Sequence, residues 1–162
     1  MERDQFVNSQ HPESELTSRI IRCAFVVLNE FGFGFLEAVY RKAMAVELIH
    51  CGIPTQQEVD FFLLHRTKDV GLYRADLVVA ERVIVEIKTG LIPDPVGPQL
   101  TLNYLKASTL QVGLFIRRLF RKRRRNPTSN EALTRQYQQF SADFSALSVA
   151  WVRRSGPGGE NQ

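Results

Sequence analysis

Three charged residues, Asp76, Glu86 and Lys88, interrupt two apolar runs in the middle of the chain. The runs, residues 72–79 (LYRADLVV) and 83–88 (VIVEIK), are rich in β-branched residues and are separated by three residues, a length that suits a β-hairpin. A charged side chain inside a buried hairpin is costly unless it is paired or binds an ion. These three positions therefore constrain both the fold and the chemistry of the chain.

The expected register of this hairpin places the charges opposite one another. If the residues that flank the loop pair, opposed residue numbers add up to 162, so Asp76 faces Glu86 and Arg74 faces Lys88. Because side chains alternate along a strand, these four share one face of the sheet. The other face takes Tyr73, Ala75, Leu77, Val85 and Ile87.

Two carboxylates that face each other on neighbouring strands repel. Directly opposed Cβ atoms lie about 5 Å apart, where two charges at an effective dielectric constant near 20 repel by roughly 3 kcal/mol. A favourable cross-strand pair contributes only about 0.2–1 kcal/mol. A hard divalent cation such as Mg²⁺, or protonation of one carboxyl, would relieve the repulsion. The alternative is a solvated face, which a loop of two or four residues would favour by changing the register.

Charge and hydropathy restrict the class of protein. Seven of the 21 basic residues lie in residues 117–125 (RRLFRKRRR), which leaves 14 basic against 17 acidic residues elsewhere, so the basic character belongs to one segment. No apolar run reaches the ~18 residues of a membrane span and the first residues resemble no signal peptide, so a cytoplasmic protein without membrane contacts is expected. Cys23 and Cys51 lack the spacing of a zinc motif, and two reduced core thiols are expected.

The remainder of the chain is typical of a single α/β domain. Helices are expected over residues 15–30 and 35–50, a first strand over 56–64, a helix from about Pro98, and a further strand over 110–116. With the hairpin, the order α-α-β-β-β-α-β predicts a mixed sheet of four or five strands flanked by helices. A helix over 130–141 and a strand over 147–152 are also predicted.

Four blocks of the sequence resemble one protein family. Gly34–Tyr40 (GFLEAVY) matches the signature Gly-x-x-Glu-x-x-Tyr, and Tyr73–Val79, Val83–Lys88 and Gln99–Leu105 follow in the order of that family's later blocks. The chain thereby resembles the GxxExxY proteins, a bacterial branch of the PD-(D/E)XK nuclease superfamily. Four ordered blocks are a more specific match than any one of them. The resemblance implies a restriction-endonuclease-like core.

The resemblance also implies roles for residues at the matching positions. Asp76 and Glu86 would hold Mg²⁺, or Mn²⁺ in its place, while Lys88 would position the attacking water and stabilise the phosphate. Gln99, at the start of its helix, would support Lys88 or the substrate. The implied catalytic residues are Asp76, Glu86, Lys88, Glu37 and Gln99, and the implied metal ligands or acidic neighbours of the metal are Asp76, Glu86, Ile87 (through its carbonyl) and Glu37.

Several of these residues also have a purely structural interpretation. Glu37 would form a surface pair with Arg41, one helical turn later. Tyr40 and Tyr104 fit packing positions, with Tyr40 placing its hydroxyl on a hydrogen-bond partner. Gln99 would satisfy backbone donors at the start of a helix.

The chain departs from the family after Ile116, where arginines replace the Asn and Gly of its relatives. The expected organisation is a flexible segment 1–14, a nuclease-like domain 15–116, and a divergent, partly disordered tail 117–162. The basic run would either contact phosphates of nucleic acid or form a solvated segment without a role. Its candidate phosphate-binding residues are Arg117, Arg118, Arg121, Lys122, Arg123, Arg124 and Arg125.

The expected function is a metal-dependent nuclease that hydrolyses phosphodiester bonds of nucleic acid, with DNA as the substrate. Many nucleases on this fold pair to cut both strands, so a homodimer is also envisaged. The alternative is a nuclease-fold module that binds nucleic acid or a partner protein without cleaving. The electrostatically costly cluster of Asp76, Glu86 and Lys88 favours an enzyme, because a scaffold would not require it.

Overall fold

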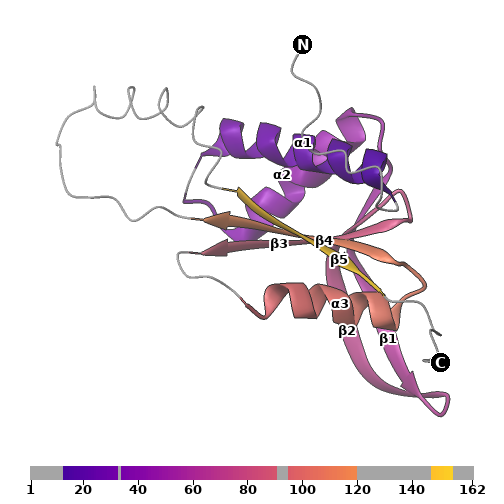
Figure 1. Ribbon diagram of the computed structural model, residues 1–162. Helices are drawn as coiled ribbons and strands as arrows, with labels where there is room; N and C mark the ends of the chain where they lie inside the picture. The colour runs from indigo at the N-terminus through magenta and orange to yellow at the C-terminus, as the bar shows by residue number, and fades with distance from the viewer. Residues whose placement is uncertain (1–12, 33, 91–94, 120–146, 155–162) are drawn as a thin grey trace, which may run out of the picture.

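The computed structural model of the chain describes residues 13–32, 34–90, 95–119 and 147–154 (Figure 1). Its elements confirm the α/β class and the predicted order α-α-β-β-β-α-β, with a fifth strand where residues 147–152 predict one. The helix predicted over 130–141 lies outside the described residues. The elements are α1 (Ser14–Phe31), α2 (Glu37–His50), β1 (Thr55–His65), β2 (Lys68–Val79), β3 (Val83–Gly90), α3 (Gly97–Ala107), β4 (Val112–Leu119) and β5 (Leu147–Arg153).

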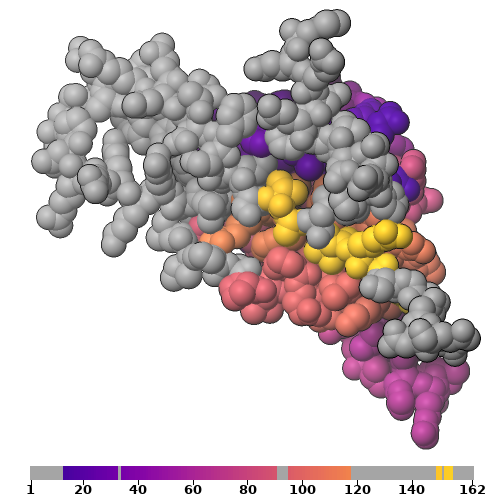
Figure 2. All heavy atoms as spheres, viewed as in Figure 1, coloured from indigo at the N-terminus to yellow at the C-terminus, as the bar shows by residue number. Residues whose placement is uncertain are grey.

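The five strands form one mixed sheet in the order β1-β2-β3-β4-β5. Neighbouring strands are antiparallel except β3 and β4, which are parallel because α3 connects them as a crossover helix. Helices α1 and α2 cover one face of the sheet and α3 covers the other (Figure 1). The tip of the β1–β2 hairpin projects from the body of the molecule (Figure 2).

Each face of the sheet has its own apolar core. The core under α1 and α2 includes Ile20, Leu48, Leu77, Val85 and Leu114. The core under α3 includes Ala75, Val78, Ile84, Tyr104 and Leu105. Strand β3 supplies both cores by alternation, which fixes the sheet between the two helical layers.

The register of the β2–β3 hairpin is confirmed next to the turn and wrong beyond it. Three pairs have residue numbers that add up to 162, namely Leu77↔Val85, Val78↔Ile84 and Val79↔Val83. The ladder ends there, so Asp76 is not paired with Glu86, nor Arg74 with Lys88. Arg74 instead forms an ion pair with Asp60 of β1, with 2.6 Å between Nε and Oδ1.

The ladder ends because the backbone is irregular around Asp76. The Ile87 N–H donates to Asp76 Oδ2 at 2.9 Å, so a side chain takes a donor that a continued ladder would offer to the backbone. On the other side of β2, Glu58 has a φ of 53° and is passed over by the β1–β2 pairing. The predicted alternation is therefore wrong for Tyr73 and Ala75, which pack under α3 while Leu77 packs under α1 and α2.

Helix α3 lies close against β4 because glycine stands at the contact. A Cβ at Gly97 would overlap the ring of Phe115. Gly97→Ala is therefore expected to lower the free energy of unfolding by about 1–3 kcal/mol, measured by urea denaturation. Gly71→Ala is the matched control, since its Cβ would meet only Leu63 Cβ, at 3.9 Å. Equal stability of the two variants would contradict the close packing of α3.

No helix in the described part of the chain combines the length and hydropathy that a membrane-spanning helix needs.

The two cysteines differ in exposure. Cys23 is buried in α1 as expected, but Cys51 is exposed at the C-terminal end of α2, so the prediction of a core thiol is wrong for Cys51. The reason is that Cys51 is the capping residue just after α2 and the chain turns away through Gly52, at a φ of 73°.

Candidate active site

The point where β2 and β3 separate brings the predicted charges together with the start of α2. Asp76 and Glu86 are buried, with 9% and 3% of their surface exposed. Lys88 Nζ lies 3.6 Å from Glu86 Oε1 and 3.1 Å from Glu37 Oε1. The structure therefore gathers four of the five predicted catalytic side chains, Asp76, Glu86, Lys88 and Glu37, from β2, β3 and the first turn of α2.

Both buried carboxyls are poorly solvated acids. Burial raises the pKa of Asp76, against the opposing effects of the Ile87 N–H bond and the Lys88 charge. Burial and then the Asp76 charge raise the pKa of Glu86 to about 7. Glu86 Oε2 is also buried without a hydrogen-bond partner. An orphan carboxylate oxygen of this kind is costly, so its buried surroundings favour either a proton or a cation on Glu86.

Lys88 keeps its charge in this setting. Burial alone would lower its pKa, but the hydrogen bond and charge of Glu37, followed by the charges of Glu86 and Asp76, raise it above the ordinary value. A lysine held as an ammonium donates hydrogen bonds and stabilises negative charge, and it does not accept a proton at neutral pH.

Arg41 and Glu58 also contact the cluster, although the sequence gives no signal for Glu58 and suggests another partner for Arg41. Arg41 Nη1 lies 3.4 Å from Asp76 Oδ1, and Arg41 Nη2 lies 3.2 Å from Glu58 Oε1. The expected surface pair of Glu37 with Arg41 is thus replaced by contacts to the cluster. The sequence does carry a signal for Arg41, because Glu37 and Arg41 are four residues apart and share one helix face.

The aromatic and amide residues near the cluster lie mostly where packing places them. The Tyr40 hydroxyl donates to the Gly32 carbonyl at 2.8 Å, and the ring is buried. Tyr104 packs edge-on against Tyr73, and burial, then the charges of Glu86 and Asp76, raise its pKa. Gln99 is exposed in the first turn of α3, and its Nε2 donates to Asn103 Oδ1 at 3.3 Å rather than to Lys88.

Arg117 differs from the other residues of the basic run. It lies on β4 in register with Lys88 of the parallel neighbour β3, is 6% exposed, and its Nη2 is buried without a hydrogen-bond partner. Gly90, two residues after Lys88, lies beside that nitrogen, since a Cβ there would be 3.9 Å from it. One nitrogen of the Arg117 guanidinium is thus buried without a partner, on the strand next to the one that carries Lys88. Arg118 is described only in its backbone, and Arg121, Lys122, Arg123, Arg124 and Arg125 lie outside the described residues.

The donor set fits a hard divalent cation at Asp76 and Glu86. Carboxylate oxygens are the ligands that Mg²⁺ prefers, and the orphaned Glu86 Oε2 is a ligand atom without a competing partner. Glu37 is different, because its carboxylate is engaged by the Lys88 ammonium. The residues that suit a cation are therefore the two buried carboxyls, with Glu37 acting on the lysine beside them.

Of the comparisons with known proteins, the family model decides where the chain belongs. A search of curated protein sequences gives no match. Among solved structures, one titled "Crystal structure of SSO0001" is similar at 17% identity over 75% of this chain and 71% of that chain, with a TM-score of 0.30. The model of the PD-(D/E)XK nuclease superfamily matches residues 14–128, from the start of α1 past the end of β4. Since that match covers well over half of the chain, and includes every residue of the cluster, the chain belongs to the PD-(D/E)XK nuclease superfamily.

Proposed function

We propose that the chain is a metal-dependent nuclease that hydrolyses phosphodiester bonds of DNA and uses Mg²⁺. Superfamily membership supports nuclease activity in general. The observation that carries the proposal is the buried Glu86 Oε2 without a partner, next to Asp76 and a charged Lys88. The four sequence blocks further support a place in the GxxExxY branch of the superfamily.

Asp76 and Glu86 hold the cation in this proposal, and the Ile87 carbonyl is the third ligand. A divalent cation supplies Lewis-acid polarisation of the phosphate and makes water a better nucleophile at neutral pH. The Ile87 N–H fixes the Asp76 carboxylate, so its second oxygen has a defined direction. Arg41 restrains the same carboxylate from the side of α2.

Lys88 and Glu37 act as a pair on the reacting phosphate. The Lys88 ammonium donates to the attacking water or to a phosphate oxygen and offsets the negative charge that grows there. Glu37 holds Nζ at 3.1 Å and keeps the lysine charged, which makes Glu37 a positioning residue in the proposal. Gln99 remains proposed as a substrate-side residue, since it is exposed near the start of α3.

The proposal is tested by titrating Mg²⁺ or Mn²⁺ into the purified wild-type chain and Glu86→Ala, followed by calorimetry and by cleavage of single- and double-stranded DNA and RNA. The wild type is expected to bind the ion and cut DNA, and a chelator to stop the reaction. Glu86→Ala is expected to lose both properties. Nucleic-acid binding without cleavage under every ion would instead support the non-cleaving module. Faster cleavage of RNA than of DNA would overturn the proposal that DNA is the substrate.

Arg117 is proposed to bind a phosphate of the substrate next to the one that reacts. Its Nη2 has no hydrogen-bond partner and lies beside the strand that carries Lys88, and an Arg fork suits phosphate oxygens. Because Arg117 is 6% exposed, the proposal requires its side chain to turn outward when substrate binds. Arg117→Leu is expected to raise KM for DNA and to reduce the slope of log affinity against log salt by about 1. Lys106→Leu, which changes an exposed residue of α3, is the control, and its salt dependence is expected to match that of the wild type. An unchanged slope in Arg117→Leu would remove this role.

A further inference from the structure

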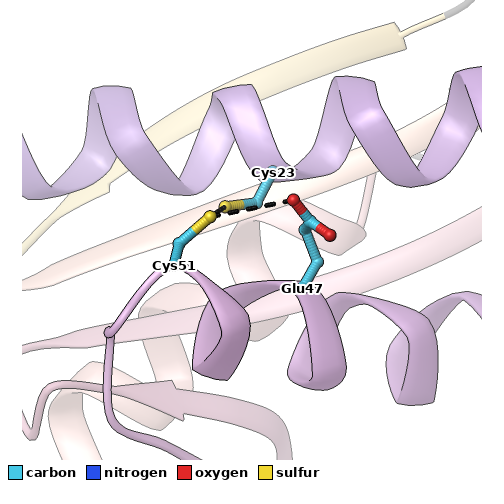
Figure 3. Close-up of side chains that lie close together, drawn as sticks. All are labelled: Cys23, Glu47 and Cys51. Atoms are coloured by element: carbon cyan, nitrogen blue, oxygen red, sulfur yellow. Dashed lines mark hydrogen bonds between the residues drawn. The ribbon is translucent and has the colours of Figure 1, made fainter.

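A second group of ligand atoms lies in the helical layer, away from the carboxylate cluster. Cys23 Sγ, Cys51 Sγ and a carboxylate oxygen of Glu47 all lie within 4.8 Å of one another. Figure 3 shows the three side chains converging between α1 and the end of α2. Within the described ranges, no other three His, Cys, Asp or Glu residues bring their ligand atoms so close together. The group lies ten residues beyond Glu37 along α2, a distance of about 15 Å on a helix.

The backbone fixes the positions of these side chains. Glu47 and Cys51 are four residues apart at the end of α2, and the Cys51 N–H donates to the Glu47 carbonyl at 2.9 Å. Arg19 of α1 donates from Nη2 to the Cys51 carbonyl at 3.0 Å. That contact ties the end of α2 to the helix that carries Cys23. The two thiols are therefore placed by the helix packing, which no spacing in the sequence reveals.

Two of the three separations are close to those of a tetrahedral zinc site. Two thiolates bound to zinc at about 2.3 Å lie about 3.8 Å apart at a tetrahedral angle, and a carboxylate oxygen at about 2.0 Å lies about 3.5 Å from each sulfur. The observed distances are 3.7 Å between Cys23 Sγ and Cys51 Sγ, and 3.7 Å between Cys51 Sγ and Glu47 Oε1. The remaining pair, Cys23 Sγ and a Glu47 carboxylate oxygen, lies within 4.8 Å, and this pair would close up around the ion.

The composition of the group also selects the ion. Sulfur ligands favour zinc over the hard Mg²⁺ that two carboxylates prefer, so this group and the Asp76–Glu86 cluster would take different ions. A nucleophilic role for Cys23 is disfavoured, because burial, followed by the hydrogen bond and charge of Cys51, raises its thiol pKa to about 12. Cys51 is exposed, which gives an ion a path from solvent.

We propose that Cys23, Glu47 and Cys51 bind one zinc ion, with water in the fourth position, and that the ion joins α1 to the end of α2. The proposal departs from the expectation of two thiols without zinc, which rested on spacing alone. It does not depend on the nuclease function.

Co²⁺ is the spectroscopic probe for this site, because bound thiolates give charge-transfer bands that carboxylates do not. The fully reduced chain is titrated with Co²⁺ and then with Zn²⁺. One equivalent of Co²⁺ is expected to produce thiolate bands, and Zn²⁺ is expected to displace it. Asp76→Asn is expected to give the same bands, which separates this site from the carboxylate cluster. Absence of thiolate bands in the fully reduced wild type would overturn the proposal.

Variants on the exposed side of the group keep the test independent of folding. Cys51→Ala is expected to lose the bands and the rise in unfolding temperature that Zn²⁺ gives the wild type. Glu47→Gln is expected to keep two sulfur ligands but to bind Zn²⁺ at least about tenfold more weakly. Glu30→Gln, on the exposed face of α1, is the control and is expected to bind as the wild type does. Bands that persist in Cys51→Ala, or an unchanged Zn²⁺ affinity in Glu47→Gln, would overturn the assigned ligands.

Discussion

Asp76→Asn is expected to reduce the rate of Mg²⁺-dependent DNA cleavage by at least about a thousandfold, which corresponds to about 4 kcal/mol. The amide removes one anionic oxygen and its charge, so the pair of carboxyls can no longer hold the cation. The remaining amide oxygen can still accept the hydrogen bond from the Ile87 N–H, so the strand geometry is retained. Initial rates of plasmid cleavage at saturating Mg²⁺ measure the effect.

The matched control for this variant is Asp69→Asn on the same strand. The Asp69 carboxylate also accepts a backbone N–H, from Gly71 at 2.9 Å, but it is exposed near the tip of the β1–β2 hairpin. Its cleavage rate is expected to stay within about twofold of the wild type, because surface substitutions of this kind change little. Cleavage that survives both Asp76→Asn and Asp76→Ala would refute the proposed metal site.

The hairpin shows how far alternation in a sequence predicts a sheet. The pairs next to the turn could be predicted, because apolar residues on both strands leave one register that buries them. The break at Asp76 could not be predicted, since it depends on a carboxylate that accepts the Ile87 N–H and on a positive φ at Glu58. Both are tertiary features with no signal in a period of two. They also open the strands where the charges lie.

The second feature that the sequence left undecided is the set of partners of the charged residues on α2. The Gly-x-x-Glu-x-x-Tyr pattern predicted Glu37 beside the charged strands, but the spacing of Glu37 and Arg41 also allowed the two to pair with each other. The packing of α2 on the sheet decides the partners, placing Lys88 on Glu37 and Asp76 on Arg41. The thiol group has the same origin, because Cys23 meets Cys51 through the contact of α1 with α2.

Glu86→Gln is expected to abolish cleavage and yet to stabilise the metal-free protein at pH 8. In the folded state the pKa of Glu86 is about 7, against an ordinary value of 4.5. Below pH 4.5 Glu86 holds its proton in both the folded and the unfolded state, so it does not contribute to the pH dependence of stability. Between 4.5 and 7 the unfolded chain releases the proton first, so folding stability falls as the pH rises, by about 3 kcal/mol in total. Glutamine carries no charge to desolvate and avoids this loss.

Urea denaturation of the wild type and Glu86→Gln in chelator, from pH 4.5 to 8, measures the difference that belongs to Glu86. Relative to the wild type, the free energy of unfolding of the variant is expected to rise by up to about 3 kcal/mol over that range. Mg²⁺ is expected to restore the stability of the wild type alone. Glu81→Gln, exposed in the β2–β3 turn, is the control and is expected to stay within about 0.5 kcal/mol of the wild type throughout. Parallel curves for the wild type and Glu86→Gln would show that the buried carboxyl carries no such penalty. The cation would then lose its energetic reason to bind there, since relief of that penalty is what favours an ion on Glu86.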